Sequence, residues 1–224
     1  MVDVIAIGAH PDDVEIAMGG TIAKMVRQGR TVGILDLSNG EPTPAGSPEI
    51  RAAEMKRAAE VLGVAWRITL DMPNRALFDS GENRQKIAAV LREHRPKVMI
   101  GHHWDDSHPD HIQAHALSVA ARFYGKLTKT DMPGEPYWVP QIFFFGLMHL
   151  QYAFKPSFII ALDEADFQKK VEALGCYQSQ GAARAWLDKL QTYNAYFGTL
   201  INRSYGEPFA SKTELALDTL DHLL

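Results

Sequence analysis

Short apolar runs alternate with segments of helical periodicity over more than half of the chain. The apolar runs predict buried β-strands at residues 2–8, 31–37, 67–70 and 97–101. The segments that place apolar residues on one helical face lie at residues 13–28, 48–62, 83–93 and 110–124. Pro48 opens the second of these helices, and Gly63 is its stop signal. The alternation predicts an α/β fold with a Rossmann-like, mainly parallel sheet and helices on both faces.

The second half of the chain has a less regular pattern. Apolar runs at residues 142–145 and 157–160 predict two later strands, and we expect two helices within residues 164–200. No repeat, low-complexity segment or domain boundary interrupts the sequence. Residues 1–224 are therefore expected to form a single domain, a size that can bury a sizeable core.

Composition and charge exclude several classes of partner. The chain is 46% hydrophobic and 22% charged, and its net charge of -4 leaves no basic footprint for nucleic acid. The apolar runs are short and interrupted, and Asp3 stands where a signal peptide would be basic, so no membrane partner is expected. Cys176 is the only cysteine, and a buried or incidental thiol is favoured over a nucleophile there. We therefore expect a cytoplasmic protein.

Two polar clusters stand where two of the predicted strands end. One is AHPDDVE at residues 9–15, and the other is DDSHPDH at residues 105–111. In a parallel sheet both fall on the carboxyl rim, where ligands bind. Imidazoles and carboxylates suit zinc, whose catalytic sites use three protein ligands and leave one position for water. His10, Asp13 and His111 would make such a site, with Asp12 beside it as general base.

Each cluster also has a simpler interpretation. Asp12, Asp13 or Asp110 could cap a helix, because aspartate accepts hydrogen bonds from free backbone N–H groups. Two such clusters at two strand ends nevertheless favour the metal site. A dinucleotide site is disfavoured, because the first turn lacks the G-x-G-x-x-G fingerprint and its two carboxylates would repel a pyrophosphate.

Other polar residues near these clusters have open roles. His102, His103 and His115 are candidate extra ligands or substrate contacts. The position of His115 one turn after His111 can suit a metal, but a supporting or structural role is favoured for it. Glu41, in the loop after the second strand, could bind a sugar hydroxyl or be a solvated loop carboxylate.

Both motifs resemble the signatures of the LmbE-like, or PIG-L-like, zinc de-N-acetylases. The A-H-P-D-D block is intact at residues 9–13 and the H-P-D-H block at 108–111. The longer stretch at residues 10–21 resembles the branch that includes bacillithiol-pathway deacetylases, which remove acetyl from N-acetylglucosaminyl malate. Further similarity is found at residues 33–41, 51, 157–158 and 205–209, so the resemblance covers most of the chain.

The resemblance implies a role for each residue of the two motifs. One zinc ion per subunit would be bound by His10, Asp13 and His111. Asp12 would be the general base, His108 would stabilise the oxyanion or protonate the leaving amine, and Asp110 would orient and charge His108. Arg51 matches an arginine that faces the substrate pocket in relatives. Relatives are commonly hexamers, so a homo-oligomer is expected.

The expected reaction is hydrolysis of an N-acetyl group on a glucosamine conjugate, with N-acetylglucosaminyl malate as the leading candidate. Chitooligosaccharide or another N-acylated amine is an alternative substrate. A non-catalytic metal- or sugar-binding protein is the alternative function, against which the intact Asp12 and His108 argue. Two departures from the family pattern bear on substrate choice: Ser107 replaces a frequent arginine, and the segment after Gln180 lacks an aromatic residue.

Overall fold

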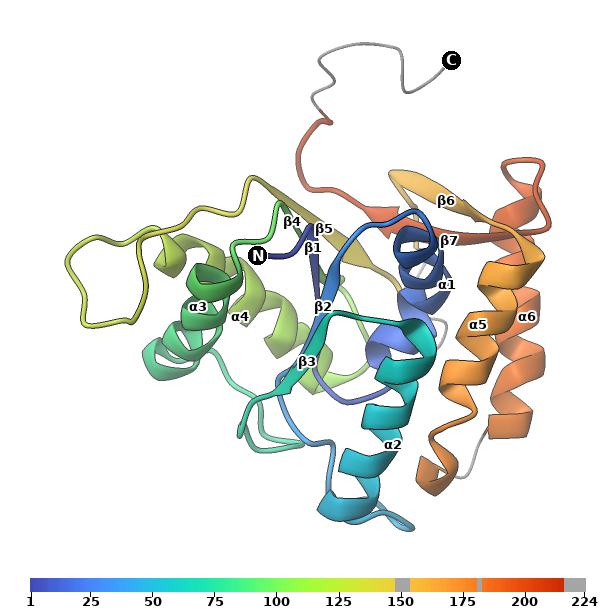
Figure 1. Cartoon of the computed structure of the whole chain (residues 1–224), viewed down its shortest axis with the longest axis horizontal. Helices are drawn as coiled ribbons and strands as arrows, with labels where there is room; N and C mark the ends of the chain where they lie inside the picture. Colours follow the sequence, from blue (N-terminus) through green and yellow to red (C-terminus); the bar gives the residue numbers. More distant parts are fainter. Residues whose placement is uncertain (148–153, 181–182, 216–224) are drawn as a thin grey trace.

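A computed structural model describes residues 1–147, 154–180 and 183–215, and in these residues one seven-stranded sheet runs through the protein (Figure 1). The strands are β1 (Val4–Gly8), β2 (Val32–Asp36), β3 (Trp66–Thr69), β4 (Val98–His102), β5 (Gln141–Phe145), β6 (Phe158–Leu162) and β7 (Tyr205–Ala210). The α-helices are α1 (Asp13–Arg27), α2 (Pro48–Leu62), α3 (Gly81–His94), α4 (Pro109–Gly125), α5 (Glu164–Leu174) and α6 (Ala183–Thr199). The strand order is β3-β2-β1-β4-β5-β7-β6.

The sheet is mainly parallel, as the sequence predicts. Strands β1 to β5 pair in parallel, whereas β7 is antiparallel to both of its neighbours, β5 and β6. Helices α3 and α4 cover one face, and α1, α2 and α5 cover the other (Figure 1). Strand β1 is buried on both faces: Val4 and Ala6 pack under α1 and α2, and Ile5 and Ile7 pack under α3 and α4. This single-domain α/β architecture confirms the expected fold class.

Helix boundaries follow local capping chemistry. The Oγ of Ser47 accepts a hydrogen bond from the backbone N–H of Ile50 at 3.2 Å, and Pro48 occupies the first turn of α2. Gly63 ends the same helix with a φ of 71°, a conformation that glycine adopts without steric cost. The predicted bounds of α2 are therefore confirmed. None of the described helices has the length and apolar character needed to cross a bilayer.

Helix α1 is kinked at Met18, and a glutamate of strand β7 stabilises the kink. Glu207 of β7 is fully buried and accepts hydrogen bonds from the N–H groups of Gly20 and Thr21 at 3.0 and 2.6 Å. Its carboxylate also pairs with the fully buried Lys170 of α5, at 2.6 Å from Nζ. A Cβ at Gly20 would clash with a methyl group of Leu162 in β6, so a larger residue there would require that side chain to move. The sequence pattern did not predict β7.

Candidate functional site

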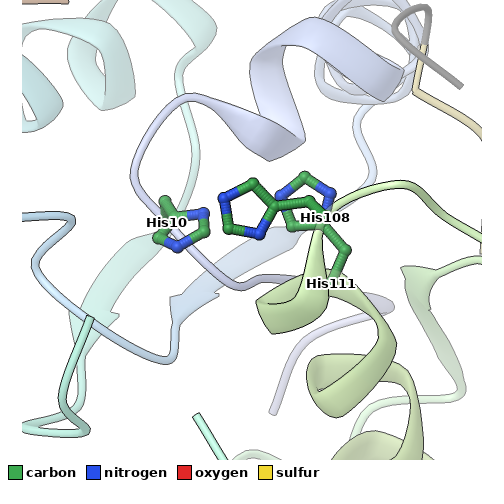
Figure 2. A group of neighbouring side chains, drawn as sticks. All are labelled: His10, His108 and His111. Atoms are coloured by element: carbon green, nitrogen blue, oxygen red, sulfur yellow. The ribbon is translucent and has the colours of Figure 1, made fainter. Parts of the chain in front are cut away.

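The two motifs meet at the carboxyl ends of the neighbouring strands β1 and β4. The turn after β1 contributes His10, and the start of α4 contributes His108 and His111. Figure 2 shows the three imidazole rings grouped at this rim. The ring centroid of His108 lies 5.0 Å from that of His10 and 4.4 Å from that of His111. The fold thus brings the motifs together as expected.

The geometry around the buried Asp13 carboxylate fits a metal ion. His10 Nδ1 lies 3.4 Å from Oδ2, and His111 Nε2 lies 3.3 Å from Oδ1. Metal–ligand bonds of about 2.0–2.1 Å in a tetrahedral site place neighbouring donor atoms about 3.3–3.4 Å apart. Among the described residues, two overlapping groups have donor atoms close enough to hold a metal: His10, His108 and His111, and Asp13, His102 and His111. The predicted set of His10, Asp13 and His111 is divided between these groups, and the two histidines face different oxygens of the Asp13 carboxylate.

A carboxylate orients each of the two flanking imidazoles. His10 Nε2 lies 3.1 Å from Asp110 Oδ2, and His111 Nδ1 lies 3.0 Å from Asp106 Oδ2. These contacts leave Nδ1 of His10 and Nε2 of His111 turned toward Asp13. Carboxylate partners on the outer ring nitrogen are typical of metal-binding histidines. The sequence argument placed Asp106 in the second cluster but gave it no role, although its position two residues before the H-P-D-H block was a usable signal.

The position of Asp110 corrects one expectation. Its carboxylate accepts hydrogen bonds from the backbone N–H groups of Arg75 and Leu77, at 2.7 and 3.2 Å, and contacts His10 rather than the His108 ring. The backbone N–H of Asp110 instead donates to His108 Nδ1 at 3.2 Å, because His108 is the N-cap of α4. Burial, followed by the charge of His111, lowers the pKa of His108, whereas the sequence argument expected a raised pKa.

The pKa of each titratable side chain in the site depends on its burial and on the charges beside it. Burial opposes protonation of His111, but Asp13 and Asp106 outweigh it and raise the pKa of His111 to about 10. Burial raises the pKa of Asp12 to about 7, with Arg51 opposing this shift and the charge of Asp13 adding to it.

Asp12 is held in an unusual conformation beside the donor atoms. Its φ of 109° lies in the left-handed region, which costs energy for a residue with a side chain. Arg51 Nη2 donates to Asp12 Oδ2 at 3.0 Å and to the carbonyl oxygen of Pro11. In the described part of the chain, Nε and Nη1 of this buried arginine have no hydrogen-bond partner.

A polar pocket of about 230 Å³ opens beside these residues. It is lined by His10, Asp12, Gly40, Thr43, Arg51, Asn74, Arg75, His108 and Gln180. Glu41, predicted as a substrate contact, is not among the lining residues; its carboxylate accepts hydrogen bonds from the N–H and hydroxyl of Thr43 at 2.6 and 2.8 Å. Sequence reasoning did not single out Thr43, Asn74 or Arg75. Residues 181–182, where the chain departs from the family pattern, lie outside the described residues.

A buried ionic network lies next to Arg51, which lines this pocket. Arg67 pairs with Asp36 and Glu15 at 2.6 and 2.5 Å, and the Tyr177 hydroxyl donates to Glu15 at 2.6 Å. The guanidinium of Arg51 lies 5.3 Å from the centre of the Tyr177 ring. The network therefore connects the sheet to the arginine that holds Asp12.

Comparisons with known proteins show which chains this protein is similar to. The conserved protein TT1542 from Thermus thermophilus superimposes with a TM-score of 0.91, with 34% identity and coverage of 97% of both chains. Diacetylchitobiose deacetylase from Thermococcus kodakarensis is 28% identical over 91% of this chain and 80% of its own length. The structure of N,N'-diacetylchitobiose deacetylase from Pyrococcus horikoshii gives a TM-score of 0.80, with 27% identity over 92% of this chain and 82% of that one.

The model of one protein family matches residues 5–122, which is more than half of the chain and includes both histidine motifs. The family is described as GlcNAc-PI de-N-acetylase, or PIG-L. The protein therefore belongs to the PIG-L family of de-N-acetylases.

Proposed function

We propose that this protein is a zinc-dependent hydrolase that removes the N-acetyl group from a glucosamine conjugate. The observation that carries the proposal is the spacing of donor atoms around Asp13, with Asp12 and His108 beside them in a polar pocket. The family membership and the deacetylase relatives give independent support.

His10, Asp13 and His111 would hold the zinc ion, which supplies Lewis-acid polarisation of the amide carbonyl and a water of lowered pKa. Asp12 accepts the proton of the attacking water as the new carbon–oxygen bond forms. A carboxylate whose pKa is raised toward neutrality suits this task, because it can then pass the proton to the leaving nitrogen. Cleavage of the carbon–nitrogen bond releases acetate and the free amine.

His108 has the tautomer needed to stabilise the developing oxyanion. Because its Nδ1 accepts the backbone N–H of Asp110, a neutral ring carries its proton on Nε2. This ring donates a hydrogen bond without first being charged, which fits its lowered pKa. A donor of this kind is worth about 3 kcal/mol in the transition state. We therefore assign His108 to the oxyanion and the leaving-group proton to Asp12.

The pocket residues favour a polar and anionic conjugate. Arg51 has two buried nitrogen atoms, Nε and Nη1, without acceptors among the described residues, and Arg75 forms no ion pair with any described residue. Asn74 and Gln180 add amide groups suited to sugar hydroxyls. N-acetylglucosaminyl malate is thus our leading candidate, and a chitooligosaccharide, the substrate class named for the relatives, is the alternative. A cytoplasmic location and a homo-oligomeric assembly stay predictions.

Acetate release tests this proposal. Purified protein is assayed with N-acetylglucosaminyl malate, diacetylchitobiose and N-acetylglucosamine, each with added zinc and with chelator. We expect chelator-sensitive turnover with preference for the malate conjugate. In the Asp12→Asn variant turnover should fall by about 10²–10⁴-fold while zinc binding is retained. Zinc binding without turnover of any N-acetyl sugar would favour the non-catalytic alternative, and a fully active Asn variant would refute the assignment of the base.

A further inference from the structure

His102, at the end of β4, is a buried histidine that the proposed reaction does not use. It is 1% exposed and lies between the two motifs. Its Nε2 accepts the backbone N–H of Ala9 at 2.9 Å, and its ring stacks on the His111 ring at 4.3 Å between centroids. One side chain thus contacts the turn after β1 and the metal-site histidine of α4.

The hydrogen bond from Ala9 fixes the start of the turn that carries His10 and Asp13. The next backbone N–H along the chain, that of His10, donates to Asp13 Oδ2 at 2.8 Å. Anchoring of the Ala9 amide by His102 therefore orients the His10 amide, which in turn orients the Asp13 carboxylate. His102 acts on the site through the backbone of this turn.

Two features of His102 cost folding free energy, so a contribution to stability does not by itself explain a histidine at this position. With Nε2 accepting from Ala9, the ring proton of the neutral imidazole is on Nδ1, which is buried and has no hydrogen-bond partner within the described residues. Nε2 also lies 3.2 Å from Asp13 Oδ2, so two electron-rich atoms face each other. A cation bound at Asp13 would withdraw charge from that oxygen and relieve the contact.

We propose that His102 is a positioning residue for the metal centre, which fixes the His10–Asp13 turn relative to His111. The inference rests on the proposed zinc site and adds a residue that raises the affinity of this site for zinc without binding the metal. Outer residues that orient metal ligands typically change metal affinity by about 10–100-fold when replaced. The acceptor atom at Nε2 is the critical feature, since it holds the Ala9 amide.

Zinc affinity, measured by competition with a chromophoric chelator, tests the proposal without reference to activity. His102→Phe keeps a ring against His111 but has no acceptor, and we expect it to weaken zinc binding by about 10–100-fold. His102→Gln places an amide oxygen near the position of Nε2, and we expect affinity within about threefold of the wild type, well short of that loss. His103→Gln is the matched control, because this neighbouring histidine contacts Asp105 and Trp104 rather than the metal site.

Thermal unfolding of the zinc-free variants separates positioning from general destabilisation. If His102→Phe does not fold, His102→Asn replaces it, because its amide is too short to reach the Ala9 N–H. Wild-type affinity in the Phe or Asn variant would overturn the proposal, as would equal losses in the Gln and Phe variants. A wild-type protein that binds no zinc would refute the proposed zinc site itself. Equal zinc affinities in the wild type and the variants would refute only the role of His102.

Discussion

Two buried carboxylates, Asp13 and Glu207, lie in opposite electrostatic surroundings. Glu207 faces the ammonium of Lys170 and two backbone N–H groups, so its charge is balanced within the protein. The ion pairs of Asp13 in the described residues are all with histidines, namely His10, His102 and His111. Imidazoles carry a positive charge only while they are protonated, as the raised pKa of His111 favours, and they provide lone pairs for a metal once the proton is released. The comparison separates a structural ion pair from the site that we propose takes up a cation.

The largest expected effect comes from removing a donor at the Asp13 centre. His111→Ala deletes a proposed ligand that belongs to both candidate metal groups. Replacement of a residue that only orients a ligand lowers metal affinity by up to about 100-fold. We expect the loss of a ligand to lower zinc affinity by more than this and to abolish acetate release. Equilibrium dialysis against zinc measures this. Wild-type zinc content in the variant would move the metal site elsewhere.

Lys170→Met should have its effect on stability instead. The substitution leaves Glu207 buried without its cation, and breaking a buried pair in this way costs about 3–5 kcal/mol. Urea unfolding of the zinc-free protein measures the loss, and zinc affinity serves as the control that should not change. A loss below about 1 kcal/mol would show that Glu207 is adequately balanced by the N–H groups of Gly20 and Thr21 alone.

Added zinc should stabilise the folded protein through the Asp13 centre only. At a free zinc concentration about 100 times the Kd, the expected gain in unfolding free energy is about 2.7 kcal/mol. Lys170→Met should keep this increment and His111→Ala should lose it. Unfolding curves with and without zinc give the comparison, and an equal increment in both variants would contradict it.

These two centres also show what the sequence could and could not predict. The candidate metal donors could be proposed because their side-chain types and spacing carry a signal, and the bounds of helix α2 were predicted from Pro48 and Gly63. Strand β7 was missed because its central residues, Gly206, Glu207 and Pro208, are poor strand formers. Glu207 can be buried there because the ammonium of Lys170 in α5 and the backbone N–H groups at the kink of α1 bind its carboxylate. Such contacts join residues far apart in the sequence, so no local sequence pattern predicts them.

The polar contacts within the site were harder to predict than its composition. Asp110 belongs to the motif, yet its carboxylate contacts His10 and the loop at residues 75–77 rather than His108. This choice depends on where α4 begins, because His108 as N-cap uses its Nδ1 to accept the Asp110 amide. Pocket residues such as Arg75 lie in loops, and the periodicity of apolar residues does not predict the conformation of a loop.

The smallest effect concerns His115, whose surroundings differ from those of His111. Its Nδ1 lies 2.9 Å from the carbonyl oxygen of His102 and its Nε2 lies 2.9 Å from the ammonium of Lys212. Burial, with the charge of Lys212, lowers the pKa of His115 to about 4, opposite to the shift at His111.

A lowered histidine pKa means that the unfolded chain binds more protons, so stability is lost as pH falls from about 6.5 toward 4. Replacing the histidine with His115→Gln should reduce this loss by about 2 kcal/mol between about pH 7.5 and 5. Urea unfolding at the two pH values measures it. Identical pH dependence in both proteins would show that His115 does not contribute.

The most direct test of the metal-dependent deacetylase account is acetate release from N-acetylglucosaminyl malate and diacetylchitobiose as zinc is added back to chelated protein. If His10, Asp13 and His111 form one catalytic site, turnover of at least one compound should start near zero. It should rise linearly and stop at one zinc ion per chain, and His111→Ala should stay inactive throughout. Turnover that survives chelation, or that shows no break at one equivalent, would contradict the account.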